Sequence, residues 1–193
     1  MSDGRALRVW LVNQYALPLG SPGITRHATL AKLMGARGVR TRIFASNEHY
    51  WKAAPTAGIE QSDESSEFVH LRTLSVDSNG AKRVASMLLF SASVLWHGLR
   101  SAPGRCSPPD VVVGSSPHPF AALSAWLLAK RYRVPFVLEV RDLWPDSLID
   151  ILGISPRHPL VVVLRMIERF LYRRAALVVA LLPASRERIV DIA

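Results

Sequence analysis

Val134-Pro-Phe-Val-Leu-Glu-Val-Arg-Asp-Leu-Trp-Pro-Asp146 carries more structural information than any other segment of the chain. Its first part is apolar without alternation, which is typical of a strand buried on both faces of a parallel sheet. Glu139, Arg141 and Asp142 lie at the carboxyl end of this strand, and Trp144-Pro145 ends it. Ligands of open parallel sheets bind just beyond such strand ends, so these ionisable groups predict a site.

Strand-like and helical patterns alternate along the rest of the chain. Strands are predicted at 7–13, 39–45, 68–73, 110–114, 134–140 and 177–182, and helices at 24–37, 81–100, 119–131, 159–174 and from 185 onward. The polar residues 46–67 predict a loop. This alternation predicts an α/β fold with a doubly wound, mostly parallel, Rossmann-like sheet. The 193 residues are expected to form one domain.

Composition restricts the partners. The net charge of +9 favours anionic partners such as phosphorylated small molecules or an acidic membrane surface. Nucleic acid is not expected, because the sequence shows no basic stripe interleaved with aromatic residues. The single cysteine, Cys106, excludes an internal disulfide and fits a reducing, cytoplasmic location. No metal or cofactor, signal peptide or membrane span is expected.

Two loops after predicted strands contain candidate binding residues. Gly20 and Gly23 lie between the first strand and the first helix, where glycines allow close approach of phosphate or sugar to the backbone. A plain turn with positive φ is the alternative, and G-x-G-x-x-G is absent, which disfavours a dinucleotide site. Ser115, Ser116 and His118 follow the fourth strand. The first and fourth strands should flank the crevice where strand order reverses, although His118 could equally be a simple loop residue.

Arg141 and Asp142 are the strongest catalytic candidates. Arginine offers a fork of donors suited to phosphate, and aspartate can orient or deprotonate a hydroxyl. The alternative is a structural network of these two residues with Glu139 and Asp146. Glu139 itself lies inside the strand, which favours a buried partner of the first-helix region.

The predicted helix 159–174 carries a basic stripe. Arg165, Arg169 and Arg173 are four residues apart and therefore share one face. Such a helix can lie on anionic lipid, or it can be a core helix with a solvated face. The core interpretation is favoured.

Several of these motifs together resemble the N-terminal domain of the family 4 glycosyltransferases, which have the GT-B fold. The resemblance is carried by the first strand with Asn13-Gln-Tyr, by Gly20, Gly23 and Thr25-Arg-His27, and by Asp110–Ala121, Phe136–Ser147, Glu168–Ala175 and Leu181–Ser185. They are similar to the branch that includes fucosamine-type transferases of bacterial surface polysaccharides. Many relatives carry His-Asp where this chain has Arg141-Asp142.

The resemblance implies one half of a two-domain enzyme. The N-terminal domain, 1–193, would bind mainly the acceptor, and a C-terminal domain that this chain lacks would bind the nucleotide-sugar. Transfer would retain stereochemistry without a divalent metal. Of the candidate residues, Asp142 matches the family pattern. From the residues themselves we predict that Asp142, Arg141 and His118 are catalytic and that Gly20, Gly23, Ser115, Ser116, Glu139 and Trp144 contact substrate. The isolated chain is expected to be inactive.

The main hypothesis is therefore a domain of a hexosyl-type glycosyltransferase of polysaccharide biosynthesis, acting on a lipid-linked or saccharide acceptor. It would be cytoplasmic and peripheral on the inner face of the cell membrane. The alternative is a non-catalytic, membrane-recruiting or acceptor-binding subunit that works with a separate donor-binding chain.

Overall fold

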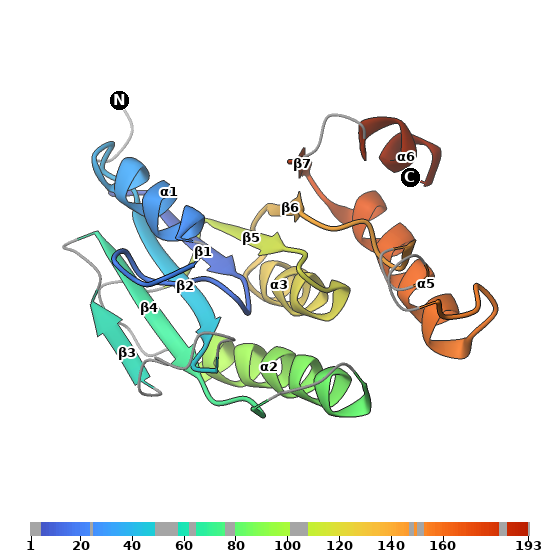
Figure 1. The fold of residues 1–193 in the computed structure, drawn as a ribbon. Helices are drawn as coiled ribbons and strands as arrows, with labels where there is room; N and C mark the ends of the chain where they lie inside the picture. Colours follow the sequence, from blue (N-terminus) through green and yellow to red (C-terminus); the bar gives the residue numbers. More distant parts are fainter. Residues whose placement is uncertain are drawn as a thin grey trace.

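The computed structural model describes residues 5–23, 25–48, 58–61, 65–75, 80–100, 108–146, 149, 153–181 and 185–192. These residues form a seven-stranded sheet flanked by helices (Figure 1). The strands are β1 (Arg8–Val12), β2 (Arg40–Ser46), β3 (Gly58–Gln61), β4 (Ser66–Leu71), β5 (Val111–Ser115), β6 (Phe136–Val140) and β7 (Leu177–Ala180). The helices are α1 (Arg26–Gly35), α2 (Ala81–Arg100), α3 (Pro119–Tyr132), α5 (Pro159–Arg174) and α6 (Ser185–Ile192). The predicted α/β class is confirmed.

The strand order is β3-β4-β2-β1-β5-β6-β7. Neighbouring strands are parallel except β3 and β4, which pair antiparallel. Chain order reverses between β1 and β5, because the chain first builds outward through β2 and β4 and then returns to the other side of β1. The prediction that these two strands flank the reversal point is confirmed, with Val9 beside Val111 and Val12 beside Gly114.

Strand β3 contradicts the prediction of a loop over 46–67. Its four residues, Gly58 to Gln61, are too few and too polar to show a strand pattern. Pairing along β4 stabilises it, and Glu60 Oε2 lies 2.9 Å from His70 Nε2 on that neighbour. Strand β4 also begins at Ser66, before the predicted boundary. Residues 49–57 and 62–64 of the predicted loop lie outside the described residues.

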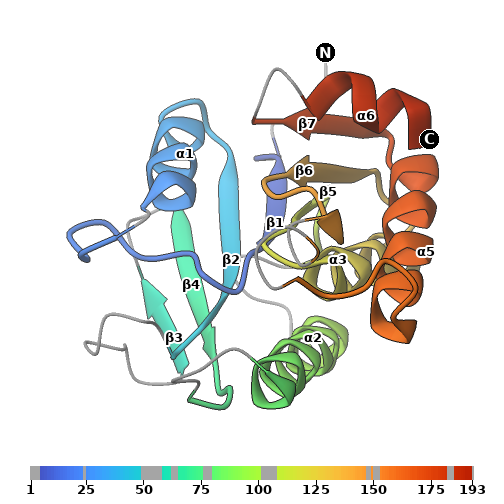
Figure 2. The same ribbon diagram turned by 45° about the vertical axis from the view of Figure 1, so that its right-hand side comes forward.

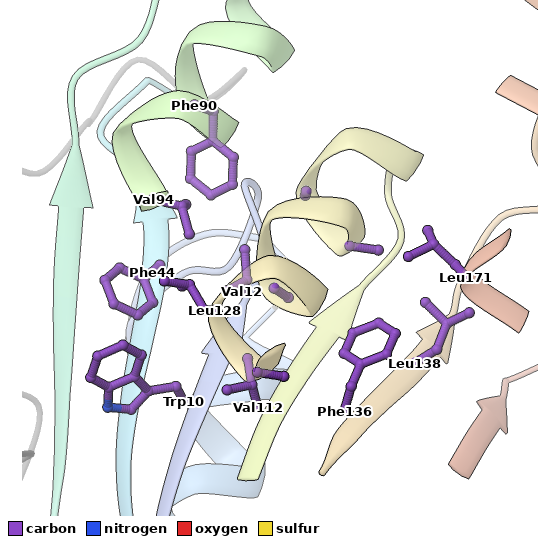
Figure 3. Close-up of a cluster of buried hydrophobic side chains, with 14 of the residues drawn as sticks. Trp10, Val12, Phe44, Phe90, Val94, Val112, Leu128, Phe136, Leu138 and Leu171 are labelled. Carbon is purple, nitrogen blue, oxygen red and sulfur yellow. The ribbon is translucent and has the colours of Figure 1, made fainter. Parts of the chain in front are cut away.

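The hydrophobic core is divided by the sheet. Trp10 and Val12 of β1 point to one face, where they meet Phe44 of β2 and Phe90 and Leu128 of α2 and α3 (Figure 3). On the other face Leu11 packs with Ile43, Phe68 and the small residues Ala28 and Ala31 of α1. Successive strand residues alternate between faces, so the uninterrupted apolar run of β1 supplies both clusters. Each fully buried large side chain stabilises the fold by about 1.5–3 kcal/mol.

Gly114 in β5 brings α3 against the sheet. A Cβ at this position would lie 2.9 Å from Ala125 Cβ and 3.0 Å from the Cα of Ala122. Such distances are shorter than normal contacts, so only glycine allows this approach. The close packing fixes the start of α3 beside the carboxyl end of β5.

Helix α5 packs by one face only. Val161, Leu164 and Leu171 are buried, and the helix lies beside β6 with α6 next to it (Figure 2). The three arginines of its basic stripe are exposed. The interpretation of a core helix with a solvated face is therefore confirmed.

Candidate functional site

The carboxyl ends of β1, β5 and β6 meet at one edge of the sheet, here called the rim. Ser116 N donates to the Glu139 carbonyl oxygen at 2.9 Å, and Arg141 N donates to Ser116 Oγ at 3.4 Å. Asn13 Nδ2, at the end of β1, donates to Ser115 Oγ at 3.4 Å. The structure thus brings together the predicted residues that follow the fourth and fifth predicted strands.

Glu139 joins β6 to the start of α1. Its Oε1 accepts from Arg26 Nη1 and its Oε2 contacts His27 Nε2, both at 2.7 Å. Only 4% of Glu139 is exposed. The interpretation of Glu139 as a buried partner of the first-helix region is confirmed, while its contact with substrate stays a prediction.

The hydrogen-bond pattern defines the tautomer of His27. Asn13 Oδ1 accepts from Tyr15 N at 2.9 Å, which leaves the Asn13 Nδ2 group as the donor to His27 Nδ1 at 3.0 Å. His27 Nδ1 is therefore an acceptor, and Nε2 carries the hydrogen donated to Glu139.

The charge on Glu139 is stabilised by these neighbours. Burial by itself would raise the pKa of its carboxyl group. The hydrogen bond from His27 and its electrostatic effect, together with the hydrogen bond from Ser115 and the charge of Arg26, outweigh burial and lower the pKa to about 2. Glu139 is thus ionised at neutral pH, and it holds the partly exposed Arg26 guanidinium at the rim.

Asp142 is the accessible carboxylate of the rim. Partial burial raises the pKa of its carboxyl group, and the charge of Arg141 opposes that rise. The neighbouring Asp146 turns away into a different network, with its Oδ2 2.7 Å from Arg188 Nε and its Oδ1 3.9 Å from Arg165 Nη2. The structural-network alternative therefore describes Asp146, and Asp142 remains available to a ligand.

His118 is fully buried beneath the rim. Its Nδ1 accepts from Ala121 N at 3.2 Å and so caps α3, while Nε2 contacts Gln14 Oε1 at 2.6 Å. Burial, followed by the charge of Arg83, lowers the pKa of His118 to about 3. Both ring nitrogens are occupied and the ring is neutral, which supports a positioning role and gives a direct catalytic role no support.

Gly20 and Gly23 lie in the exposed loop that leads into α1. Their φ angles are 85° and 130°, which L side chains rarely adopt. A Cβ at Gly20 would meet nothing within 4 Å. Backbone conformation thus accounts for these glycines as a plain turn, and contact with phosphate or sugar stays a prediction.

A recess of about 20 Å³ opens beside Asp142, with room for roughly one water molecule. Trp144 lines it, and the indole Nε1 is buried without a hydrogen-bond partner among the described residues. Glu168 and Tyr172 of α5 form the opposite wall, and Tyr172 Oη donates to Glu168 Oε1 at 3.0 Å. Burial raises the pKa of Glu168 to about 7.

Sequence reasoning missed several polar residues of this site. The residues Gln14, Arg26, His27 and Glu168 were part of the family resemblance but not of the predicted site. For Gln14, the available signal in the sequence was its position shortly after the end of β1. A glutamate on an apolar helix face was the signal for Glu168, which is 6% exposed.

Comparison with known protein families matches residues 23–193 to the family described as Glycosyl transferase 4-like domain. No curated protein sequence matches the chain. Within the described residues, every helix is too short or too polar to cross a bilayer. The family match covers most of the chain and includes β5, β6 and the residues that follow them. The protein accordingly belongs to the glycosyl transferase 4-like domain family.

Proposed function

We propose that this chain is the acceptor-side domain of a retaining glycosyltransferase that moves a hexose derivative from a nucleotide-sugar to a lipid-linked or saccharide acceptor. A second domain, outside residues 1–193, would bind the nucleotide-sugar. The product would enter bacterial surface polysaccharide synthesis on the cytoplasmic side of the membrane, and the fucosamine-type branch is the narrower assignment that we favour.

The observation that carries this proposal is the accessible Asp142 carboxylate beyond the carboxyl end of β6, one strand from the switch point between β1 and β5. Its raised pKa makes the carboxylate a better proton acceptor than an ordinary aspartate. In this role Asp142 orients the acceptor hydroxyl and takes its proton as the acceptor oxygen bonds to the anomeric carbon, on the same face from which the nucleoside diphosphate leaves.

Two cations at the rim suit the anionic substrates. Arg141 adjoins Asp142, and Glu139 holds Arg26 on the neighbouring helix. Guanidinium groups bind phosphate oxygens in a fork geometry and stabilise the charge that develops on a leaving diphosphate. Ser116 and Trp144, which line the recess beside Asp142, would contact the acceptor sugar.

The test uses the protein together with its donor-binding half, assayed with nucleotide-sugars and polyprenyl-diphosphate sugars. Asp142→Asn should lower kcat roughly tenfold or more, as expected for loss of a positioned acid–base group. Asp191→Asn, at an exposed position of α6, is the matched control and should leave kcat unchanged. Near-normal turnover of Asp142→Asn would refute the role of Asp142, and absence of any transfer by the folded wild type would refute the proposed function.

A non-catalytic, membrane-recruiting subunit is the second candidate. The exposed Arg165, Arg169 and Arg173 on α5 favour it, because such a stripe attracts anionic lipid. A tenfold or larger loss of kcat in Asp142→Asn would exclude this candidate, because a non-catalytic subunit supplies no acid–base group.

A further inference from the structure

We propose that the outer surface of α2 and α3 docks on an anionic lipid bilayer and that Leu88, Leu89, Trp96 and Leu99 enter the interface. This inference deepens the proposed function, since it names the surface from which a lipid-linked acceptor would be reached. The α2–α3 face is defined by these four residues, by Leu127, and by the cations Lys82, Arg100, Lys130, Arg131 and Arg133.

Helix α2 is apolar on two opposite sides. Its inner side, with Met87, Phe90 and Val94, is packed into the core. Its outer side exposes Leu88 (49%), Leu89 (41%), Trp96 (56%) and Leu99 (52%). A helix on the surface of a water-soluble protein normally carries polar residues on its outer side, so this apolar stripe indicates a partner.

The exposed residues form one continuous stripe. Leu88 or Leu89, Ala92, Trp96 and Leu99 follow one another every three or four residues, which is the spacing of one helix face. Helix α3 packs beside α2 and adds Leu127, which is 38% exposed. At about 1.5 Å per residue, the 20-residue helix α2 extends for about 30 Å, long enough to lie flat across many lipid headgroups.

The charges of the face identify the partner as anionic. Helices α2 and α3 contain no aspartate or glutamate. Lys82 lies at the start of α2, and Arg100 ends it. Lys130, Arg131 and Arg133 lie at the end of α3, next to the end of α2, where Tyr132 Oη donates to the Gly98 carbonyl oxygen at 2.6 Å. Cations thus flank the apolar stripe at both ends.

This combination fits a bilayer better than other partners. Leucine and tryptophan side chains gain free energy by entering the acyl boundary, while lysine and arginine stems extend to the headgroups. Each cation near an anionic membrane adds an electrostatic attraction that weakens as the salt concentration rises. The Arg100 guanidinium carbon lies 3.5 Å from the centre of the Trp96 ring, so a cation lies directly beside the apolar stripe. Binding to nucleic acid would leave the leucines without an apolar partner. Binding of this face to the same face of a second copy would bring two positively charged surfaces together.

The orientation connects the bilayer to the rim. Ser86, in the second turn of α2, accepts from Gln14 Nε2 at 3.5 Å, and Gln14 contacts His118. Arg83 is near enough to contribute to the lowered pKa of His118. The start of α2 therefore adjoins the rim, and a bilayer under α2 would present a lipid-linked acceptor at that edge.

Vesicle co-sedimentation tests the proposal on the full chain. Wild-type protein should bind phosphatidylglycerol vesicles, bind phosphatidylcholine vesicles at least tenfold more weakly, and lose affinity as salt concentration rises. The triple variant Leu88→Ser, Leu89→Ser, Leu99→Ser should bind phosphatidylglycerol vesicles at least tenfold more weakly. Leu33→Ser is the matched control, because Leu33 is equally exposed (52%) but lies on α1, across the sheet. It should bind like wild type.

A second measurement does not depend on the stability of the triple variant. Quenching by brominated phosphatidylglycerol should reach Trp96, and Trp96→Phe should remove most of the quenched emission. No binding of wild type to phosphatidylglycerol, wild-type binding by the triple variant, equal weakening by Leu33→Ser, or unchanged quenching in Trp96→Phe would each overturn the proposal. A change of oligomeric state in the triple variant would instead assign the face to a second copy.

The vesicle result is separable from the proposed function. Vesicle binding without any sugar transfer would leave this inference standing and remove the glycosyltransferase proposal. Transfer to a soluble acceptor without vesicle binding would do the reverse.

Discussion

Glu139→Gln should destabilise the protein and remove part of its sensitivity to acid. The wild-type carboxylate is buried and accepts hydrogen bonds from Arg26 and His27. Glutamine keeps the shape of the side chain but has one acceptor oxygen and no charge. Either the His27 imidazole or the Arg26 guanidinium would then face an amide NH₂ group.

The magnitude follows from the pKa of Glu139. A fall from an ordinary value of 4.5 to about 2 means that the fold favours the ionised form. At about 1.4 kcal/mol for each pKa unit, this preference corresponds to about 3 kcal/mol. Breaking a buried ion pair on one side generally costs 3–5 kcal/mol, which is of the same order. A domain of this size should lose about 2–4 °C in Tm for each kcal/mol.

The sign of the pH dependence is defined by the lowered pKa. Stabilisation by ionised Glu139 is fully present above the unfolded-state pKa near 4.5 and is lost as pH falls toward 2. Wild type should therefore lose this contribution across that window. Glu139→Gln should lack it at every pH, so the stability difference between the two proteins should shrink as pH falls.

Urea unfolding at pH 7 and at pH 3, followed by circular dichroism, measures both effects. Glu187→Gln, at an exposed position of α6, is the control and should change the free energy of unfolding by less than about 0.5 kcal/mol. A Glu139→Gln protein within that margin of wild type at pH 7, or one whose deficit does not shrink toward pH 3, would refute the reasoning.

Glu168 and Gly114 give two further predictions. Burial raises the pKa of Glu168 to about 7, so the fold binds its proton more tightly than the unfolded chain does, and stability should fall as pH rises from about 4.5 to 7. Glu168→Gln should remove this fall, and urea unfolding at pH 5 and pH 8 checks it; an unchanged fall would contradict the role of burial. Gly114→Ala should lower the free energy of unfolding by about 1–3 kcal/mol, because the added methyl group would overlap α3. Gly38→Ala, where a Cβ meets nothing within 4 Å, should lose stability only through the strain of its positive φ; a Gly114→Ala protein as stable as wild type would contradict the crowding at Gly114.

The principal elements could be read from the sequence because their patterns are local. Apolar runs such as Val134–Val140 identify buried strands, and Gly38, with φ 78°, ends the first helix region as expected. Strand β3 could not be read, because Gly58 to Gln61 have no pattern of their own and become a strand through pairing with β4.

The sequence predicted the position of the candidate site in the fold more reliably than the role of each residue in it. Residues after β5 and β6 were expected at one edge, because parallel neighbours end together. The role of His118 depends on burial and on partners at Gln14 and Ala121, and both are properties of the packed structure. The family resemblance marked Arg26 and His27, but only the fold places them against Glu139, 113 and 112 residues away.

By itself the sequence determined the fold class, the switch point, the family and the strand ends where polar groups gather. The fold class, the switch point and the strand ends follow from short-range periodicity and from residue types that every parallel sheet uses in the same way, whereas the family follows from the resemblance of the motifs. Tertiary structure decided which polar groups face solvent and which are buried as mutual partners. In the folded protein Asp142 is exposed, and Glu139 binds Arg26 and His27 at the start of α1. His118 caps α3, and one apolar side of α2 faces outward. Those outcomes depend on contacts between residues far apart in the chain, for which local patterns carry no information.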